Sequence, residues 1–171
     1  FACRFKVEII SMSEIGVPRQ FRGPPFTANG GYICGLLAGA VGGRGVAMLR
    51  AGVPLDTAVS LTPGDGEGVL LVNAEGAVLG SARPADDSQI PNPPPAPPTL
   101  EEARAFGAAS PFATRSLHRG CFSCCVEREA GEGLGVFVGQ IDGAPAGHCA
   151  GVWTPHANFA DADGNIPDEV T

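Results

Sequence analysis

The chain has 171 residues, of which 44% are hydrophobic, and its formal net charge is −7 at pH 7. This hydrophobic content is enough for a packed core, but no apolar run reaches the roughly 18 to 20 residues of a membrane-spanning helix, so we expect no membrane partner. The acidic charge argues against a nucleic-acid partner, which usually needs a basic stripe, because Lys6 is the single lysine and no basic run is longer than two residues.

Near the beginning, Phe5–Ile9 alternates apolar and charged residues, which predicts a strand with one side exposed to water. The chain has no initiating methionine and no signal peptide, so we expect that Phe1 is not the true start of the protein. Three of the six cysteines crowd within Cys121–Cys125, and Cys34 falls in an apolar run. This is a poor disulfide framework and is more typical of a protein in a reducing cytoplasm.

The stretch Phe21–Gly42 predicts a loop that leads into a buried helix. Thr27 or Asn29 can cap the start of the helix, and Gly30 and Gly31 leave the N–H groups of its first turn uncovered, so that a ligand oxygen can approach them. The residues that follow are apolar on every side, so we expect other elements to surround this helix. The helix start is therefore a candidate oxyanion site. The alternative is that Asn29 is only a cap and the glycines only allow close packing.

Four short strands are predicted after this helix, separated by turn sequences rich in glycine, proline and aspartate. The spacings are short enough for an antiparallel meander. One strand, a buried helix and a meander together indicate an α+β fold. The four segments are Gly45–Ala51, Thr57–Thr62, Gly68–Asn73 and Ala77–Ala82.

A proline-rich spacer over Arg83–Pro98 interrupts this pattern and indicates a boundary between two units. Thr99 and Glu102 have the spacing of a capping box, which predicts a short helix through about Ala108. Two further strands are predicted, at Gly135–Gly139 and within Ala150–Thr154.

The order of elements resembles the hotdog fold, in which an antiparallel sheet wraps around one long helix. Several motifs make the chain similar to thioesterase-superfamily proteins of actinobacterial type, which carry two hotdog halves on one chain. The motifs are Arg22-Gly23-Pro24-Pro25, Ala28-Asn29-Gly30-Gly31-Tyr32, Leu49-Arg50 with Pro54-Leu55-Asp56, Cys121-Phe122-Ser123-Cys124, Gly133-Leu134 and Trp153-Thr154-Pro155.

This resemblance implies a complete hotdog half at residues 1–84, with its central helix near 29–42. A linker and short helix follow at 85–109, and a partial second half with the cysteine cluster at 110–171. Such proteins continue past the region of Glu169 into a second helix that carries an Asp, so the second half is expected to be truncated. They also usually have a glycine where Cys125 stands. An open second sheet would expose apolar surface, which predicts either poor solubility or a homodimer that hides this surface.

The resemblance also implies a site. In hotdog thioesterases the thioester carbonyl sits against N–H groups at the start of the central helix, and a carboxylate across the interface attacks it or activates water. The helix here has no acidic residue of its own, so the base must come from elsewhere, and the candidates are Glu169, Asp168 and Asp56. The implied catalytic residues are Asn29, Gly30, Gly31 and Glu169, and the implied substrate-binding residues are Thr27, Tyr32, Arg50 and Trp153.

The expected function is therefore binding of acyl thioesters such as acyl-CoA, with hydrolysis as a further expectation. Two alternatives stay open. The first is a non-catalytic acyl-CoA-binding module, and the second is a zinc-binding interaction protein built around Cys121–Cys125. For the second, His118, Cys121 and Cys124 have spacings compatible with zinc, whereas a structural turn with buried thiols would use the same residues without metal.

Overall fold

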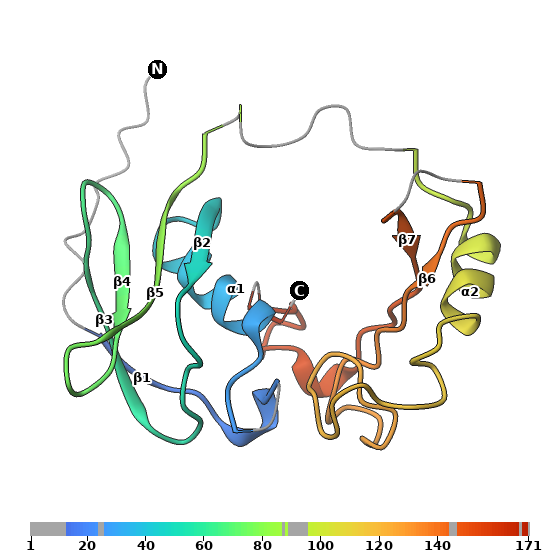
Figure 1. The fold of residues 1–171 in the computed structure, drawn as a ribbon, viewed down its shortest axis with the longest axis horizontal. Helices are drawn as coiled ribbons and strands as arrows, with labels where there is room; N and C mark the ends of the chain where they lie inside the picture. Colours follow the sequence, from blue (N-terminus) through green and yellow to red (C-terminus); the bar gives the residue numbers. More distant parts are fainter. Residues whose placement is uncertain are drawn as a thin grey trace.

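The computed structural model describes residues 13–23, 26–86, 88, 96–143, 147–167 and 169–170. The strand predicted at Phe5–Ile9 lies outside these residues. The described part is a mixed α+β structure with a five-stranded antiparallel sheet, a two-stranded sheet and two α-helices (Figure 1). No helix in this part combines the length and the apolar character required to cross a membrane.

The larger sheet has the strand order β1-β3-β4-β5-β2, and all neighbouring strands are antiparallel. The four strands predicted after the helix all form, but only three of them make the meander. The meander prediction was wrong for the first strand, which pairs with β5 at the far edge, with Ala47 opposite Ala82. The bounds are β1 Ser13–Gly16, β2 Gly45–Leu49, β3 Ala58–Pro63, β4 Val69–Val72 and β5 Val78–Pro84.

After β2, at one edge of the sheet, the chain crosses to β3, which lies next to the strand at the opposite edge. A short bridge between Thr27 and Pro54 and a left-handed Asp56, with φ of 52°, shape this crossing. The Asp56 N–H donates to the carbonyl oxygen of Val17 at 2.9 Å, which fixes the crossing beside β1. A tight turn would have placed β2 next to β3, and the intervening residues provide a crossing instead.

Helix α1 (Gly30–Ala40) packs against β2, β4 and β5 of the sheet. Ile33 and Leu37 are the buried side chains of this helix, each with 1% of its surface exposed. The expectation that other elements surround the helix was wrong for the described residues, because Gly31 and Gly39 are exposed and Cys34 is half-buried. A single sheet covers only one side of α1. The strand residues that share its core include Val59, Val69, Leu71, Leu79 and Ala82.

Helix α2 (Leu100–Ala108) begins at the predicted capping box, which is confirmed. The Glu102 N–H donates to Thr99 Oγ1 at 3.3 Å, and the Thr99 N–H donates to Glu102 Oε2 at 2.8 Å. The helix packs on β6 (Gly139–Gln140) and β7 (Cys149–Ala150). This contact requires glycine, because a Cβ atom on Gly139 would overlap the carbonyl group of Phe106.

The two strands predicted in the second unit are much shorter than expected. Of Gly135–Gly139 only Gly139 is in a strand, and of Ala150–Thr154 only Ala150. The Val136 N–H donates to the carbonyl oxygen of Ser123 at 2.9 Å, which draws this segment toward the cysteine cluster instead of into a sheet.

Two short 3₁₀-helices, η1 (Arg19–Phe21) and η3 (Ala157–Phe159), complete the described elements. Figure 1 shows the five-stranded sheet and α1 on one side of the molecule and α2 with β6 and β7 on the other. The segment η1 and the loops after α2 lie between them, at the bottom of that view. A second core around Phe122 forms at this junction.

We expect Leu37→Ala to lower the free energy of unfolding by about 2–5 kcal/mol, because it leaves a cavity between α1 and the sheet. The measurement is urea denaturation followed by circular dichroism. Met48→Ala is the control, since 54% of the Met48 side chain is exposed and little packing is lost. Equal effects of the two substitutions would contradict the packing of α1 on this sheet.

Candidate functional site at the start of helix α1

The first turn of α1 leaves backbone donors uncovered. Asn29 is the N-cap, and its side-chain Oδ1 accepts a hydrogen bond from the Tyr32 N–H at 3.1 Å. Within the described part of the chain, the N–H groups of Gly30 and Gly31 have no hydrogen-bond acceptor. Gly31 is exposed and Gly30 half-buried. Two donors at the positive end of the helix dipole are therefore available to a ligand oxygen.

The other end of the Asn29 amide binds the cysteine-containing segment. Asn29 Nδ2 donates to Ser123 Oγ at 3.0 Å and lies 3.8 Å from Cys121 Sγ. The side chain therefore caps α1 and fixes a distant loop at the same time. Both ends of the Asn29 amide are therefore engaged within the protein, and its predicted catalytic role stays a prediction. The sequence analysis assigned no role to Ser123, although this residue lies in the Cys121-Phe122-Ser123-Cys124 motif, because no local signal shows a contact with residue 29.

An aromatic cluster supports this junction. The rings of Phe21 and Tyr32 are stacked, with centroids 4.0 Å apart and an interplanar angle of 11°. Phe122, which is 1% exposed, meets Phe21 edge-on at 4.9 Å and Phe159 edge-on at 5.6 Å. Val170 belongs to the same core. Four separate segments of the chain therefore converge beside the first turn of α1.

Glu169 lies close enough to Tyr32 to act on its ionisation. The pKa of Tyr32 is raised above its usual value, first by burial of the phenol and then by the negative charge of Glu169. Tyr32 follows Gly30 and Gly31 in the same helical turn, and the catalytic roles of Gly30, Gly31 and Glu169 stay predictions.

The remaining predicted binding residues have other surroundings. The Thr27 carbonyl accepts from the Gly23 N–H at 2.9 Å, and the Arg50 N–H donates to the Leu79 carbonyl at 2.8 Å. The side chain of Arg50 is exposed. Trp153 is half-buried, and its Nε1 atom is buried without an acceptor among the residues the structure describes. No hydrogen bond between described residues joins Arg50 or Trp153 to the start of α1.

The cysteine cluster is held mainly by hydrogen bonds. Cys125 Sγ accepts from the Gly120 N–H at 3.0 Å and donates to Glu127 Oε2 at 3.0 Å. Hydrogen bonds from Cys125 and Ser116 lower the pKa of Glu127 to about 2. Burial, and then the neighbouring Cys121, raise the pKa of Cys124 to about 11. The Cys124 thiol is therefore protonated at neutral pH.

The predicted metal ligands are only partly gathered. Cys121 and Cys124 interact, and the Cys121 N–H donates to the carbonyl oxygen of His118 at 3.1 Å. Over the described ranges, however, no group of three or more His, Cys, Asp or Glu side chains is arranged to hold a metal ion. Zinc binding by His118, Cys121 and Cys124 stays a prediction.

No protein-family model matches the chain, and no curated protein or solved structure shows significant similarity to it. The architecture is α+β, with an antiparallel sheet that packs one face on a helix. This architecture is compatible with a hotdog fold. The resemblance to double-hotdog thioesterases stays a hypothesis that rests on the motifs and on the geometry at the start of α1.

We expect Glu169→Gln to lower the pKa of Tyr32, because loss of the carboxylate charge removes one of the two effects that disfavour the tyrosinate. The pKa should stay above the usual value of about 10, since burial is the larger cause. The chain has one tyrosine, so absorbance at the tyrosinate band reports Tyr32 alone.

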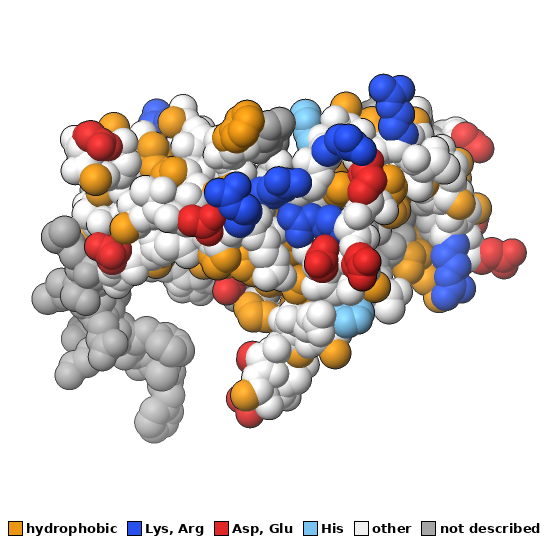
Figure 2. All heavy atoms as spheres, turned by 90° about the horizontal axis from the view of Figure 1, so that it is seen from below, with side chains coloured by type: hydrophobic (Ala, Val, Ile, Leu, Met, Phe, Trp, Pro, Cys, Tyr) orange, Lys and Arg blue, Asp and Glu red, His pale blue; other side chains and the backbone are white. Residues whose placement is uncertain are grey.

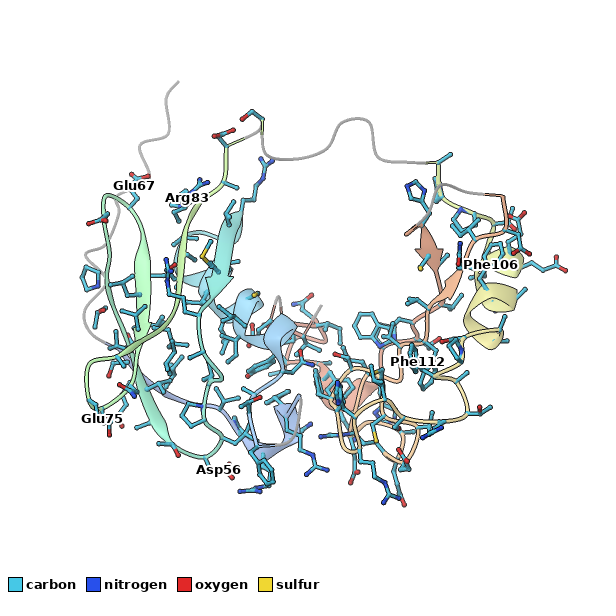
Figure 3. All side chains as sticks on the ribbon, in the orientation of Figure 1. Asp56, Glu67, Glu75, Arg83, Phe106 and Phe112 are labelled. Atoms are coloured by element: carbon cyan, nitrogen blue, oxygen red, sulfur yellow. The ribbon has the colours of Figure 1, made fainter. Side chains whose placement is uncertain are left out.

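Glu75→Gln is the control for this titration. Glu75 is exposed on the turn between β4 and β5, at the outer end of the sheet and far from α1 (Figure 3). An unchanged pKa of Tyr32 in Glu169→Gln would contradict the placement of Glu169 beside the helix start.

We expect the Cys124 thiol to react slowly with iodoacetamide at pH 8, because the thiolate is the nucleophile and the pKa is about 11. Its rate should rise about tenfold per pH unit below that value. Peptide mapping by mass spectrometry measures the rate at each cysteine. The exposed Cys149 is the internal reference. Cys124 alkylation as fast as that of Cys149 at pH 8 would contradict the raised pKa of Cys124.

Proposed function

We propose that the protein binds acyl thioesters such as acyl-CoA at the start of α1 and hydrolyses them there. The observation that carries this proposal is the combination of two uncovered backbone donors, on Gly30 and Gly31, with the nearby carboxylate of Glu169. A donor pair and a carboxylate are what thioester hydrolysis needs from a protein. The resemblance to double-hotdog thioesterases supports the same conclusion.

In this proposal the thioester carbonyl oxygen accepts hydrogen bonds from the N–H groups of Gly30 and Gly31. Water adds to the carbonyl carbon, and Glu169 takes a proton from the water. The negative charge that develops on the carbonyl oxygen is stabilised by the donors and the helix dipole. The carbonyl then re-forms, the carbon–sulfur bond breaks, and the thiolate leaves and takes up a proton. One such donor contributes roughly 2.7–4 kcal/mol in characterised acyl-transfer enzymes.

The stacked Phe21 and Tyr32 rings give the site a fixed wall. Phe122 packs edge-on against both rings, with centroid separations of 4.9 Å to Phe21 and 6.3 Å to Tyr32. A helix start held by packed rings does not have to reorganise when charge develops, which is the condition for electrostatic stabilisation.

A second candidate function is acyl-CoA binding without turnover. It is favoured by the sequence of α1, which has no acidic residue, so the site depends on Glu169 from the end of the described chain. Such a module would use the same donors to hold the carbonyl. The two functions differ in whether thiol is released.

The test measures thiol release and ligand-induced melting shifts with a panel of acyl-CoA esters. Gly30→Pro removes one donor from the first position of the helix, where proline is well tolerated. The preceding Asn29 has φ of −64° and ψ of 130°, which suits a residue before proline. We expect turnover to fall at least tenfold, which corresponds to about 1.4 kcal/mol.

Gly30→Ala is the matched control, because it keeps the N–H group. Its added Cβ would lie 3.5 Å from Leu49 Cδ1, an ordinary packing distance. Glu169→Gln should also abolish most of the turnover while Glu75→Gln does not. Melting shifts without thiol release in the unsubstituted protein would select the binding module. Absence of both signals would reject both functions.

A further inference from the structure

A second candidate site lies between η1 and the segments on either side of the cysteine cluster Cys121–Cys125. It is an open cavity of about 850 Å³, and its charged lining residues are Arg19, Arg22, Arg119, Arg128, Glu127 and Glu132. Four arginines face two glutamates, so the lining is positive in a chain whose net charge is −7. Figure 2 shows basic side chains gathered near the middle of this face.

Two of these arginines converge on one acceptor. Arg22 Nε donates to the carbonyl oxygen of Gly120 at 2.9 Å, and Arg128 donates to the same oxygen through Nε at 3.1 Å and Nη2 at 2.8 Å. Burial, and then the neighbouring Arg22, lower the pKa of Arg128. In the described part of the chain neither guanidinium forms an ion pair with a carboxylate. Two like charges are thus held together without a direct counter-charge.

The position of Arg22 leaves a free donor edge. Its guanidinium lies directly over Gly120, where a Cβ atom would overlap it, and only Nε has an acceptor among the described residues. Both Nη groups are therefore available. Arg128 is fixed more fully, because its Nη2 also donates to the Gln20 carbonyl at 2.7 Å and its Nη1 to the Glu132 carbonyl. The backbone thus orients both cations in advance.

Neither lining carboxylate forms an ion pair with Arg22 or Arg128 among the described residues, although the charge of Glu132 partly offsets the lowering of the Arg128 pKa. Glu127 accepts hydrogen bonds from Ser116 and Cys125, and its nearest arginine, Arg119, lies 3.7 Å away with 88% of its side chain exposed. Arg19, which also lines the cavity, is paired with Asp56 at 3.1 Å. Arg22 and Arg119 therefore keep donors that an entering anion can use.

We propose that this cavity binds the phosphate or diphosphate group of a small phosphorylated ligand. A guanidinium fork matches phosphate oxygens bidentately, and several guanidinium groups around one cavity suit a group with more than one negative charge. The cavity has the size of a small-molecule site. The proposal does not depend on thioester binding at α1, although the two sites share a loop, because the Phe122 N–H donates to the Arg22 carbonyl at 2.7 Å.

The test is titration of the full chain with inorganic pyrophosphate at low ionic strength, followed by calorimetry and by ³¹P NMR line width. We expect saturable binding that weakens as salt is added. Arg22→Gln should weaken it at least tenfold, since it removes the free donor edge. Arg104→Gln, on the exposed face of α2 and outside this cavity, makes the same change in net charge and should leave binding unchanged.

Arg119→Gln covers the case in which Arg22→Gln fails to fold. Its exposed side chain makes one weak ion pair, so the fold should tolerate the change while binding falls severalfold. Competition by ADP and by coenzyme A then identifies the source of the phosphate groups, and displacement by either supports the proposal. Absence of saturable pyrophosphate binding, or equal binding in the Arg22, Arg119 and Arg104 variants, would overturn it.

Discussion

The two hydrogen bonds of the Asn29 side chain are the constraint on which the rest of this structure depends. One carboxamide caps α1 through the Tyr32 N–H and fixes the cysteine-containing segment through Ser123 Oγ. The cap decides where the helix begins and so which N–H groups remain uncovered. The bond to Ser123 decides what lies next to them. A single side chain therefore defines both the donors of the proposed thioester site and the loop that borders it.

The same loop organises a second set of groups. Phe122 fills the core beside Tyr32, and its backbone N–H donates to the Arg22 carbonyl oxygen. Two residues earlier, the Gly120 carbonyl oxygen accepts hydrogen bonds from the guanidinium groups of both Arg22 and Arg128. In this loop, Phe122 contributes to an apolar core, and the Gly120 carbonyl contacts the two cations. This division explains how a chain with net charge −7 maintains a concentrated positive region: the cations are oriented by carbonyl oxygens, which do not cancel their charge.

Local signals in the sequence identified the elements, and distant contacts decided the rest. The capping box at Thr99 and the strands β2 to β5 depend on neighbouring residues and were predicted from the sequence. For the cap of α1 the sequence left two candidates, Thr27 and Asn29, of which the structure has Asn29. The pairing of β2 with β5 depends on the crossing between β2 and β3, which no turn motif predicts. The sequence predicts a strand at Gly135–Gly139, but the Val136 N–H bonds to the Ser123 carbonyl instead of to a neighbouring strand. Arg22 and Arg128 share one acceptor, the Gly120 carbonyl, but no sequence motif links the two arginines, so their contact could not be predicted.

The sequence separation of these contacts has a consequence for the order of folding. Asn29 and Ser123 are 94 residues apart, and Arg22 and Gly120 are 98 apart, whereas β3, β4 and β5 are joined by short turns. Closing a long loop costs more chain entropy than closing a short one, and nonlocal contacts slow folding. We therefore expect the sheet to form before the junction closes, and both proposed sites to be completed only when residues 22–29 meet residues 120–123.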